Sequence, residues 1–503
     1  MYNLRVFKSV RKNVFENIRH VSVNGSYKPQ HIDTNKTNIK YTQIDSKIRC
    51  SSKHWDIQNW SVSDIEKAQK KHIVGTWGVT NVNAGPLFVK SEGVYMYDKD
   101  NKQYMDWTSQ AVCANLGHSA PSAIINAVQK QMKTLPILYS ELGMCEIRSR
   151  LSCLISELLP GDFEGVLFPS SGAEANEVAI RIARRYTGRH KIFTHYRAYH
   201  GSTNCTLNAT GDWRRNFAEP EAGFVKMMHP FPNTFSWKFS NAITEEESVR
   251  LMLSTVEEQI IHEGPDTIAG FLVESVTGSG GTLIAPSSYM QGLRRLCDKY
   301  GILMIADEVM VGFCRTGKMW GFQHFDILPD IVTAAKGISG SFLPISTVVM
   351  RQPLKTHFEK HPLGWGSTYH AHPVSLACAY ECIKYMIEHD LLCNVQSLEC
   401  VMIEEMNNLI ERHWCIKQGR ALGLFGCFEI TDANGNLIQC AGKPTTKETA
   451  LLKSALQKNG LLCMVRSPFL HCAPPLVITK QELRRGFSLL KNALQQFERE
   501  MTK

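Results

Sequence analysis

Several polar residues in this chain stand where an apolar, strand-like run ends and a turn begins. The four stretches are "DIVTAAKG" (330–337) with Lys336, "ILMIADEV" (302–309) with Asp307 and Glu308, "FPSSGAEANE" (168–177) with Ser171, and "YRAYHGST" (196–203) with Tyr199 and His200. Burying an ammonium or a carboxylate without a partner is costly, so such residues are expected to meet a ligand or each other. In parallel sheets, functional groups gather at the carboxyl ends of the strands, which would bring these stretches together.

This combination suits a flat, phosphorylated, cationic aromatic aldehyde. The Ser-Gly-Ala run at 171–173 opens a helix, where exposed N–H groups and the helix dipole favour phosphate. Tyr199 can stack on a ring, Asp307 can pair with a ring nitrogen, and the Lys336 amine can bond to an aldehyde. We therefore predict pyridoxal phosphate as the cofactor. The plainer interpretation of the same residues is a helix cap, a core aromatic side chain and a lysine that reaches solvent.

A rival interpretation rests on "GFCRTGK" (312–318), which matches the phosphate-loop pattern G-x-x-x-x-G-K. The acidic strand "ILMIADE" would then hold magnesium. However, Met319 stands where that pattern needs Ser or Thr, and the acidic strand comes before the loop instead of well after it. A nucleotide-binding protein is therefore only a remote alternative.

A metal site is a weaker alternative still. Cys378 and Cys382 lie four residues apart, with His370 and His372 just upstream. Cysteines at this spacing on an apolar helix are more typical of a packed core than of zinc ligands, so we predict no metal.

The elements that would position these residues alternate between apolar strands and amphipathic helices over about 126–370. Runs such as "TIAGFLVES" and "LPISTVVM" read as buried strands, and Ala175, Val178, Ala179 and Ile182 keep a helical period. Buried strands separated by helices predict an α/β fold with a mostly parallel sheet covered on both faces. Before this region, "GVYMYDKDNKQYMDW" predicts a hairpin. After it, "PVSLACAYECIKYMIEHD" predicts a long helix.

Charge is concentrated at the N-terminus. Residues 1–53 contain eleven Lys and Arg residues against three acidic ones, a net +8 of the chain's +9. An amphipathic, basic and acid-poor start is typical of an organellar transit peptide, so we predict the mitochondrial matrix, or otherwise the cytoplasm. The near-neutral remainder argues against a nucleic-acid groove, and no apolar run is long enough to span a membrane.

In this order, the motifs resemble those of the class III (omega-type) aminotransferases, which are fold-type I pyridoxal-phosphate enzymes. The matching pieces over about 70–490 include "NLGH" (115–118), "SGAEANE" (171–177), "YHG" (199–201), "AKG" (335–337) and "APPL" (473–476). The chain is most similar to the branch that acts on taurine, beta-alanine and similar omega-amines with pyruvate. The implied reaction is transamination between an amine or omega-amino acid and a small 2-oxo acid, although decarboxylases, racemases and aminomutases share the fold.

The resemblance also implies roles for individual residues. Lys336 would hold the cofactor covalently and move protons, Asp307 would pair with its ring nitrogen, and Tyr199 and Val309 would cover its two ring faces. The phosphate would be bound by Ser171, Gly172 and Ala173, and by Thr368 of a neighbouring subunit in a homodimer with shared active sites.

The same resemblance implies a large cofactor domain (126–370) and a small α+β domain from both chain ends (56–125 and 371–503), after a basic extension (1–55). Two positions bear on the substrate. Ser279 stands where the ornithine and GABA subgroup has a glutamate gate, which favours pyruvate or glyoxylate over 2-oxoglutarate. Arg466, or alternatively His471, would bind the substrate carboxylate, and Trp77 would form an aromatic wall of the pocket.

Overall fold

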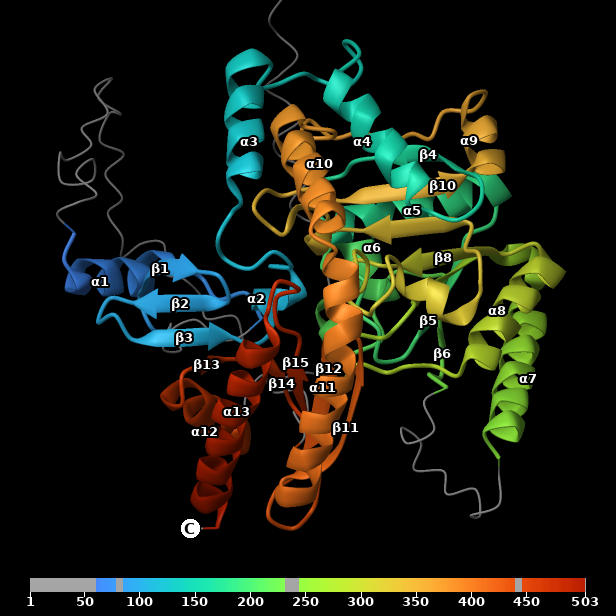
Figure 1. Ribbon diagram of the computed structural model, residues 1–503. Coiled ribbons are helices and arrows are strands. Elements are labelled where there is room, and N and C mark those ends of the chain that lie inside the picture. Colours follow the sequence, from blue (N-terminus) through green and yellow to red (C-terminus); the bar gives the residue numbers. More distant parts are fainter. Residues whose placement is uncertain (1–59, 78–84, 231–243, 439–445, 503) are drawn as a thin grey trace, which may run out of the picture. The chain divides into compact units, whose positions relative to one another are not determined.

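The structure is a computed structural model that describes residues 60–77, 85–230, 244–438 and 446–502 (Figure 1). The chain forms two compact units, Met1–Asn81 and Val82–Lys503. In the described part of the first unit, helix α1 (Val62–His72) begins after Ser61, whose Oγ accepts a hydrogen bond from Asp64 N at 3.1 Å. The basic extension predicted over 1–55 lies outside the described residues.

The second unit is built around a seven-stranded sheet with the strand order β4-β10-β9-β8-β7-β5-β6. The strands are β4 (Phe163–Leu167), β5 (Lys191–His195), β6 (Phe224–Met227), β7 (Ile268–Glu274), β8 (Leu303–Asp307), β9 (Ile331–Ala334) and β10 (Thr347–Arg351). β10 pairs antiparallel with both β4 and β9, whereas the pairs from β9 to β6 are parallel. β7, β8 and β9 are buried at every position, which explains their continuous apolar sequences.

Helices cover both faces of this sheet, and α2 lies in the connection between β3 (Gln103–Asp106) and α3. They are α2 (Ser109–Val112), α3 (Ser122–Thr134), α4 (Glu146–Glu157), α5 (Gly172–Thr187), α6 (Asn204–Ala209), α7 (Glu245–Glu263), α8 (Ser287–Tyr300), α9 (Gln352–Phe358) and α10 (Pro373–Glu388), with 3₁₀ helices that include η3 (Trp213–Phe217), η6 (Gly321–Phe325) and η7 (Lys336–Ser339). α5 packs Ala175, Val178 and Ile182 against the sheet in one buried cluster, and a second cluster fills the other face. α10, drawn in orange, lies beside α3 (Figure 1).

Two smaller sheets combine segments that are far apart in the sequence. The first contains β1 (Phe88–Glu92), β2 (Tyr95–Asp98), β3 (Gln103–Asp106) and β13 (Leu461–Leu462), and the second contains β11 (Ile416–Leu422), β12 (Phe425–Ile430), β15 (Phe469–Cys472) and β14 (Val465–Arg466). The helices of this part are α11 (Leu391–Arg412), α12 (Lys447–Lys458) and α13 (Lys480–Met501). β13 pairs parallel with β3, so both chain ends contribute to one sheet.

This arrangement confirms the predicted α/β fold, with a large, mostly parallel sheet and smaller sheets from both chain ends. The hairpin β2–β3 and the long helix α10 also lie where the sequence predicted them. The exact domain boundaries remain a prediction. In the described part of the chain, no helix is long and apolar enough to cross a membrane.

Candidate active site

Lys336 and Asp307 lie at the ends of neighbouring strands. β8 ends at Asp307, β9 ends two residues before Lys336, and Asp307 pairs in register with Thr333. Lys336 has a φ of 48°, a left-handed conformation that is uncommon for a residue with a Cβ and recurs at functional sites. Burial lowers the pKa of the Lys336 amine, which favours its neutral, nucleophilic form.

The Asp307 carboxylate is oriented by three donors. Its Oδ2 accepts hydrogen bonds from Asn176 Nδ2 and from the Nδ1–H tautomer of His200, each at 2.8 Å. Its Oδ1 accepts a hydrogen bond from Val309 N at 3.0 Å. Thr333 Oγ1 donates to Asn176 Oδ1 at 2.7 Å and so fixes the amide. The site therefore presents a buried carboxylate in one defined orientation.

Glu274, the last residue of β7, holds the turn that carries Tyr199. Its carboxylate accepts hydrogen bonds from Tyr199 N at 2.9 Å and Gly278 N at 2.7 Å. Burial raises the pKa of Glu274 to about 7. The Arg214 guanidinium lies over the Tyr199 ring, 3.5 Å from its centroid, and Arg214 is ion-paired with Asp212. One face of the Tyr199 ring is therefore packed against a cation, which fixes the ring in place.

Helix α5 begins beside these groups. Ser171 caps the helix, and the N–H groups of Gly172 and Ala173 belong to its first turn, where no intrahelical acceptor exists. A Cβ on Gly172 would lie 2.7 Å from Val309 Cγ1, and a Cβ on Gly201 would lie 2.6 Å from Ala173 Cβ. Glycine at both positions therefore allows Val309 and the turn after Tyr199 to approach the start of the helix.

The two candidate carboxylate-binding residues differ in charge. Burial lowers the pKa of Arg466, on β14, to about 10, so this side chain is cationic at neutral pH. Besides burial, the charge of Arg466 lowers the pKa of Lys336, so the two lie within electrostatic reach. His471, on β15, is fully buried with Nε2 3.2 Å from Gly278 O, and burial lowers its pKa to about 4. His471 is therefore neutral at pH 7.

Ser279 lies in a buried hairpin between β7 and α8. The hairpin is held from the smaller sheets by Arg420, whose Nε donates to Gly281 O at 2.7 Å and to Thr282 O at 3.1 Å. Arg420 Nη2 also pairs with Glu429 at 2.8 Å. At position 279 the hairpin therefore offers a hydroxyl and not an acid.

The structure brings most of the predicted site residues together, but not all. Thr368 lies in an exposed turn, and the neighbouring Ala371 N donates to Phe168 O at 2.9 Å, close to the start of α5. Trp77 belongs to the first unit, so its predicted role in the pocket stays a prediction.

Four residues around the site were not among the predicted site residues: Asn176, His200, Glu274 and Arg214. Asn176 had a signal in the sequence, because it is a polar residue on the apolar face of α5 between Ala175 and Val178. His200 lies within "YHG" and Glu274 lies near the end of the strand-like run "TIAGFLVES", but neither pattern by itself indicates a role for the side chain. Arg214 had no sequence signal, since its contact with Tyr199 depends on the tertiary fold.

The rival phosphate loop is not supported by its surroundings. Arg315, in the middle of "GFCRTGK", is fully buried and donates to Pro474 O at 2.6 Å and Asn115 Oδ1 at 2.9 Å. The segment leads into the short helix η6 instead of a long helix with a free N-terminus. It is a buried connection and does not form a phosphate cradle.

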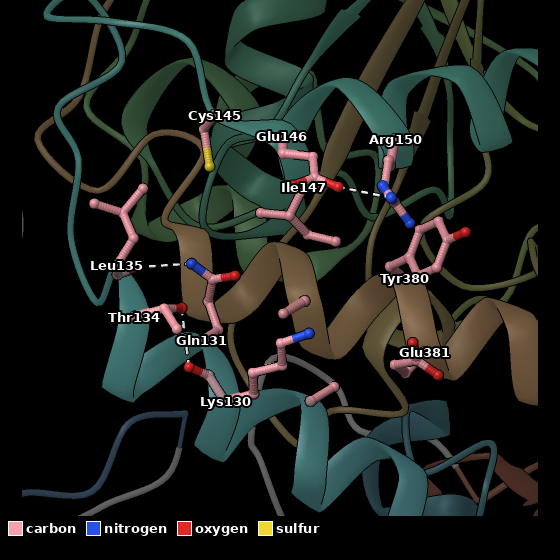
Figure 2. Close-up of a pocket in the computed structure, with 12 residues that line it drawn as sticks. Lys130, Gln131, Thr134, Leu135, Cys145, Glu146, Ile147, Arg150, Tyr380 and Glu381 are labelled. Atoms are coloured by element: carbon pink, nitrogen blue, oxygen red, sulfur yellow. Dashed lines mark hydrogen bonds and ion pairs between the residues drawn. The ribbon is translucent and has the colours of Figure 1, made fainter.

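Two cavities lie away from the Lys336–Asp307 pair. One, of about 440 Å³, lies between α3, α4 and α10, and Figure 2 shows the Arg150–Glu146 ion pair at its edge. It contains none of the predicted site residues. The second, of about 560 Å³, is lined by residues from 106–111 and 461–464 among others, and its last lining residue, Met464, is two residues before Arg466 in the sequence.

The residues present fit pyridoxal phosphate. A helix start with free N–H groups suits its phosphate, the oriented Asp307 carboxylate suits a protonated ring nitrogen, and the buried Lys336 amine, whose pKa is lowered by burial, suits its aldehyde. Val309 and the turn that follows Tyr199 both approach the start of α5.

Comparison with known proteins agrees with this fit. The sequence profile described as "Aminotransferase class-III" matches residues 79–494, and the chain belongs to this family. It is a pyridoxal-phosphate-dependent aminotransferase (transaminase) of fold-type I, as the sequence predicted.

Its relatives differ in their substrates. The chain is 32% identical to "Gamma aminobutyrate transaminase 1, mitochondrial" of Solanum lycopersicum, over 84% of each chain. It is 29% identical to "Acetylornithine aminotransferase" of Bacillus anthracis, over 84% of this chain and 97% of the relative.

Among solved structures, it resembles taurine:2-oxoglutarate aminotransferase from Bifidobacterium kashiwanohense in complex with PLP and glutamate. The TM-score is 0.83 and the identity 33%, over 88% of this chain and 99% of that chain. It also resembles an (S)-enantioselective omega-transaminase from Thermomicrobium roseum, with a TM-score of 0.79 and 29% identity, over 87% and 99% of the two chains.

Proposed function

We propose that this aminotransferase moves an amino group from an amine or omega-amino acid to a small 2-oxo acid, with pyruvate or glyoxylate favoured. The observation that carries the proposal is the pairing of cationic Arg466 near Lys336 with a neutral Ser279 hairpin. Arg466 supports recognition of one carboxylate. The hairpin has no acid that could mask an arginine, as a glutamate at position 279 would when a monocarboxylate is bound instead of a dicarboxylate such as 2-oxoglutarate.

The protein's own residues have separate tasks in this proposal. Pyridoxal phosphate, when bound, supplies an electron sink for the carbon that loses a proton. Lys336 Nζ holds the cofactor and carries the proton, a role supported by its burial and lowered pKa. Asp307, oriented by Asn176 and His200, keeps the ring nitrogen protonated. The N–H groups at the start of α5, with Ser171, bind the phosphate.

Arg466 is favoured over His471 as the carboxylate-binding residue. A carboxylate is bound best by a charged donor, and His471 is neutral because burial lowers its pKa to about 4. Its Nε2 also already contacts Gly278 O. Arg466 keeps its charge, and its Nε contacts the soft Met464 Sδ at 3.3 Å, a weak partner that a substrate carboxylate could replace.

The choice of acceptor needs a direct test, because a similar structure is that of an aminotransferase named for 2-oxoglutarate. The test is a panel of donors against pyruvate, glyoxylate and 2-oxoglutarate, with kcat/KM measured for each pair. We expect pyruvate or glyoxylate to exceed 2-oxoglutarate. A preference for 2-oxoglutarate of more than about tenfold, or about 1.4 kcal/mol in the transition state, would refute the Ser279 argument.

We also propose a homodimer with shared active sites. An exposed apolar stretch supports it: Ile137, Leu142 and Met144 are 60%, 79% and 95% exposed, which is unusual for side chains of this size. In the dimer, Thr368 would reach the phosphate of the neighbouring subunit. Light scattering gives the mass, and mixing Lys336→Ala with Thr368→Ala subunits should form dimers with one intact site. Monomers that bind the cofactor at full affinity would contradict the shared site.

We propose the mitochondrial matrix as the location, because of the basic extension and because relatives in tomato and rice are named as mitochondrial. Residues 1–55 fused to a fluorescent protein should direct it to mitochondria. The control is the same fusion with Arg5, Arg11 and Arg19 changed to Glu. Equal cytoplasmic signal from both fusions would contradict the proposal.

A further inference from the structure

Residues 107–116, here called the Asp106 loop, connect β3 to the segment before α3 and have a strained backbone. Ser109, Gln110 and Val112 have φ values of 46°, 60° and 57°, in the left-handed region that residues with a Cβ rarely adopt. For β-branched Val112 this conformation is especially unfavourable. Such conformations persist only when the surrounding structure enforces them, and they are frequent at functional sites.

The buried carboxylate of Asp106 enforces this conformation from one side. It accepts hydrogen bonds from Gln110 N at 2.7 Å, Thr108 N at 3.2 Å and Gln110 Nε2 at 3.0 Å, and His118 Nε2 lies 2.8 Å away. Only 1% of the Asp106 residue is exposed. The carboxylate thus satisfies two backbone N–H groups that the left-handed turn directs away from any ladder or helix.

The fully buried Arg315 holds the loop from the other side. Its Nη2 donates to Asn115 Oδ1 at 2.9 Å and to Ser109 Oγ at 3.3 Å, and Ser109 Oγ in turn donates to Ala473 O at 2.7 Å. Between Asp106 and Arg315, the loop has little freedom to relax.

The Asp106 loop contacts the segment that carries Lys336. A Cβ on Gly337 would lie 2.5 Å from Asn115 Nδ2, so Asn115 packs directly on the residue after the lysine. Likewise, a Cβ on Gly340 would lie 3.5 Å from Leu116 Cγ.

The Asp106 loop also lines the cavity of about 560 Å³, which reaches Met464, two residues before Arg466 in the sequence. Asp106, Thr108 and Gln110 line this cavity together with Cys463 and Met464. Met464 is held by the same loop, because its N–H donates a hydrogen bond to Thr108 Oγ1 at 3.2 Å. One strained loop therefore contacts both the lysine segment and the residues that lead into Arg466.

We propose that Asp106 is a positioning residue. It holds the Asp106 loop in its left-handed conformation and thereby sets the spacing between Lys336 and Arg466, the residue proposed to bind the substrate carboxylate. The inference rests on the proposed function of Lys336 and Arg466. Asp106 itself need not touch substrate or cofactor.

The test compares Asp106→Asn with Asp98→Asn. Asp98 is a matched control, because it is also a buried carboxylate of the β2–β3 hairpin and accepts from Lys102 N at 2.9 Å and Tyr104 Oη at 3.0 Å. It lies at the other end of the hairpin and does not line the cavity. We expect Asp106→Asn to raise the donor KM about tenfold with kcat changed less, whereas Asp98→Asn lowers the melting temperature alone.

The decisive variant is Asp106→Asn with Gln110→Gly. Glycine adopts a φ of 60° without strain, so this second change should recover most of the lost KM if Asp106 acts by enforcing that conformation. If Asp106→Asn does not fold, Gln110→Pro takes its place, because proline removes the N–H and forbids positive φ at an exposed position. It should raise KM in the same way.

A measurement that needs no amine donor tests the positioning role independently of the proposed substrates. When the loop loosens, water reaches the Lys336 segment, and the pH midpoint of the bound cofactor's visible absorbance should rise in Asp106→Asn but not in Asp98→Asn. Equal behaviour of the two Asn variants, or no recovery by glycine, would overturn the positioning role whichever donor the enzyme uses.

Discussion

Replacing Asp307 by Asn is expected to leave the fold and the cofactor in place and to remove most of the activity. Asparagine can still accept from Asn176 Nδ2 and His200 Nδ1 through its one oxygen. Its NH₂ group would then face Val309 N, whose hydrogen bond of 3.0 Å is lost, at a cost of about 1 kcal/mol in the free energy of unfolding. This cost is too small to unfold the protein.

The loss of the charge has a much larger effect on the reaction. The Asp307 side chain is 3% exposed, so solvent would hardly screen it from the ring nitrogen of a bound cofactor. Two unit charges about 4 Å apart interact by about 4 kcal/mol at an effective dielectric constant of about 20. Each 1.36 kcal/mol changes a rate about tenfold, so kcat should fall by about three orders of magnitude.

The assay is the half-reaction with donor alone, followed in a stopped-flow instrument as the cofactor absorbance changes to that of its amine form. Cofactor content is measured on the same samples. The control is Asp330→Asn, which removes a carboxylate paired with Arg294 at 2.7 Å near the opposite end of β9 and should keep kcat within about twofold. If Asp307→Asn keeps its cofactor and turns over within tenfold of the wild type, the assigned role of Asp307 is wrong.

Three further predictions follow from the same structure. Borohydride should fix the cofactor covalently on Lys336, and peptide mapping that finds it on another lysine would refute the assignment; Lys336→Ala should abolish both the visible absorbance and the fixation. Arg466→Ala should raise the KM of an omega-amino acid at least about tenfold, because one charge-assisted pair of hydrogen bonds is lost. The KM of a carboxylate-free amine should stay nearly unchanged, and equal losses on both donors would mean that Arg466 holds structure. Burial lowers the pKa of His471 from 6.5 to about 4, so between these pH values the histidine is neutral in the folded protein and protonated in the unfolded chain. The contribution of His471 to stability is therefore present above pH 6.5 and is lost as the pH falls toward 4. The free energy of unfolding of wild type should therefore fall by about 3 kcal/mol more than that of His471→Leu over this range, measured by urea titration at each pH, and parallel pH curves for the two proteins would contradict the buried, neutral histidine.

The sequence was sufficient to predict the residues that end buried strands. Lys336 and Asp307 stand out because an apolar run cannot end on a charge without a reason, and the parallel sheet then brings neighbouring strand ends together. The helix start at 171–173 could be predicted for a similar reason, since its capping residue and small residues are local features.

Contacts between distant segments could not be predicted in the same way. Arg214 packs on Tyr199 from a short 3₁₀ helix, and Arg420 reaches the hairpin that holds Ser279 from about 140 residues further along the chain. Neither residue has a local pattern that distinguishes it from an ordinary surface arginine. The strained backbone of the Asp106 loop could not be predicted either, because "TSQAV" contains no glycine, the residue that usually indicates a left-handed conformation.

The parallel pairing of β3 with β13 has a consequence for biosynthesis. Trp107 N donates to Leu462 O at 2.9 Å, and Ala473 N donates to Trp107 O at 3.0 Å, so the ribosome must complete more than 350 further residues before Trp107 has its backbone partners. During that interval the β3 edge is open to pairing with other chains, which is the usual route to strand-mediated aggregation. All strands of the seven-stranded sheet have been synthesised by residue 351. A nascent chain stalled between residues 351 and 461 should nevertheless depend on chaperones that shield the β3 edge.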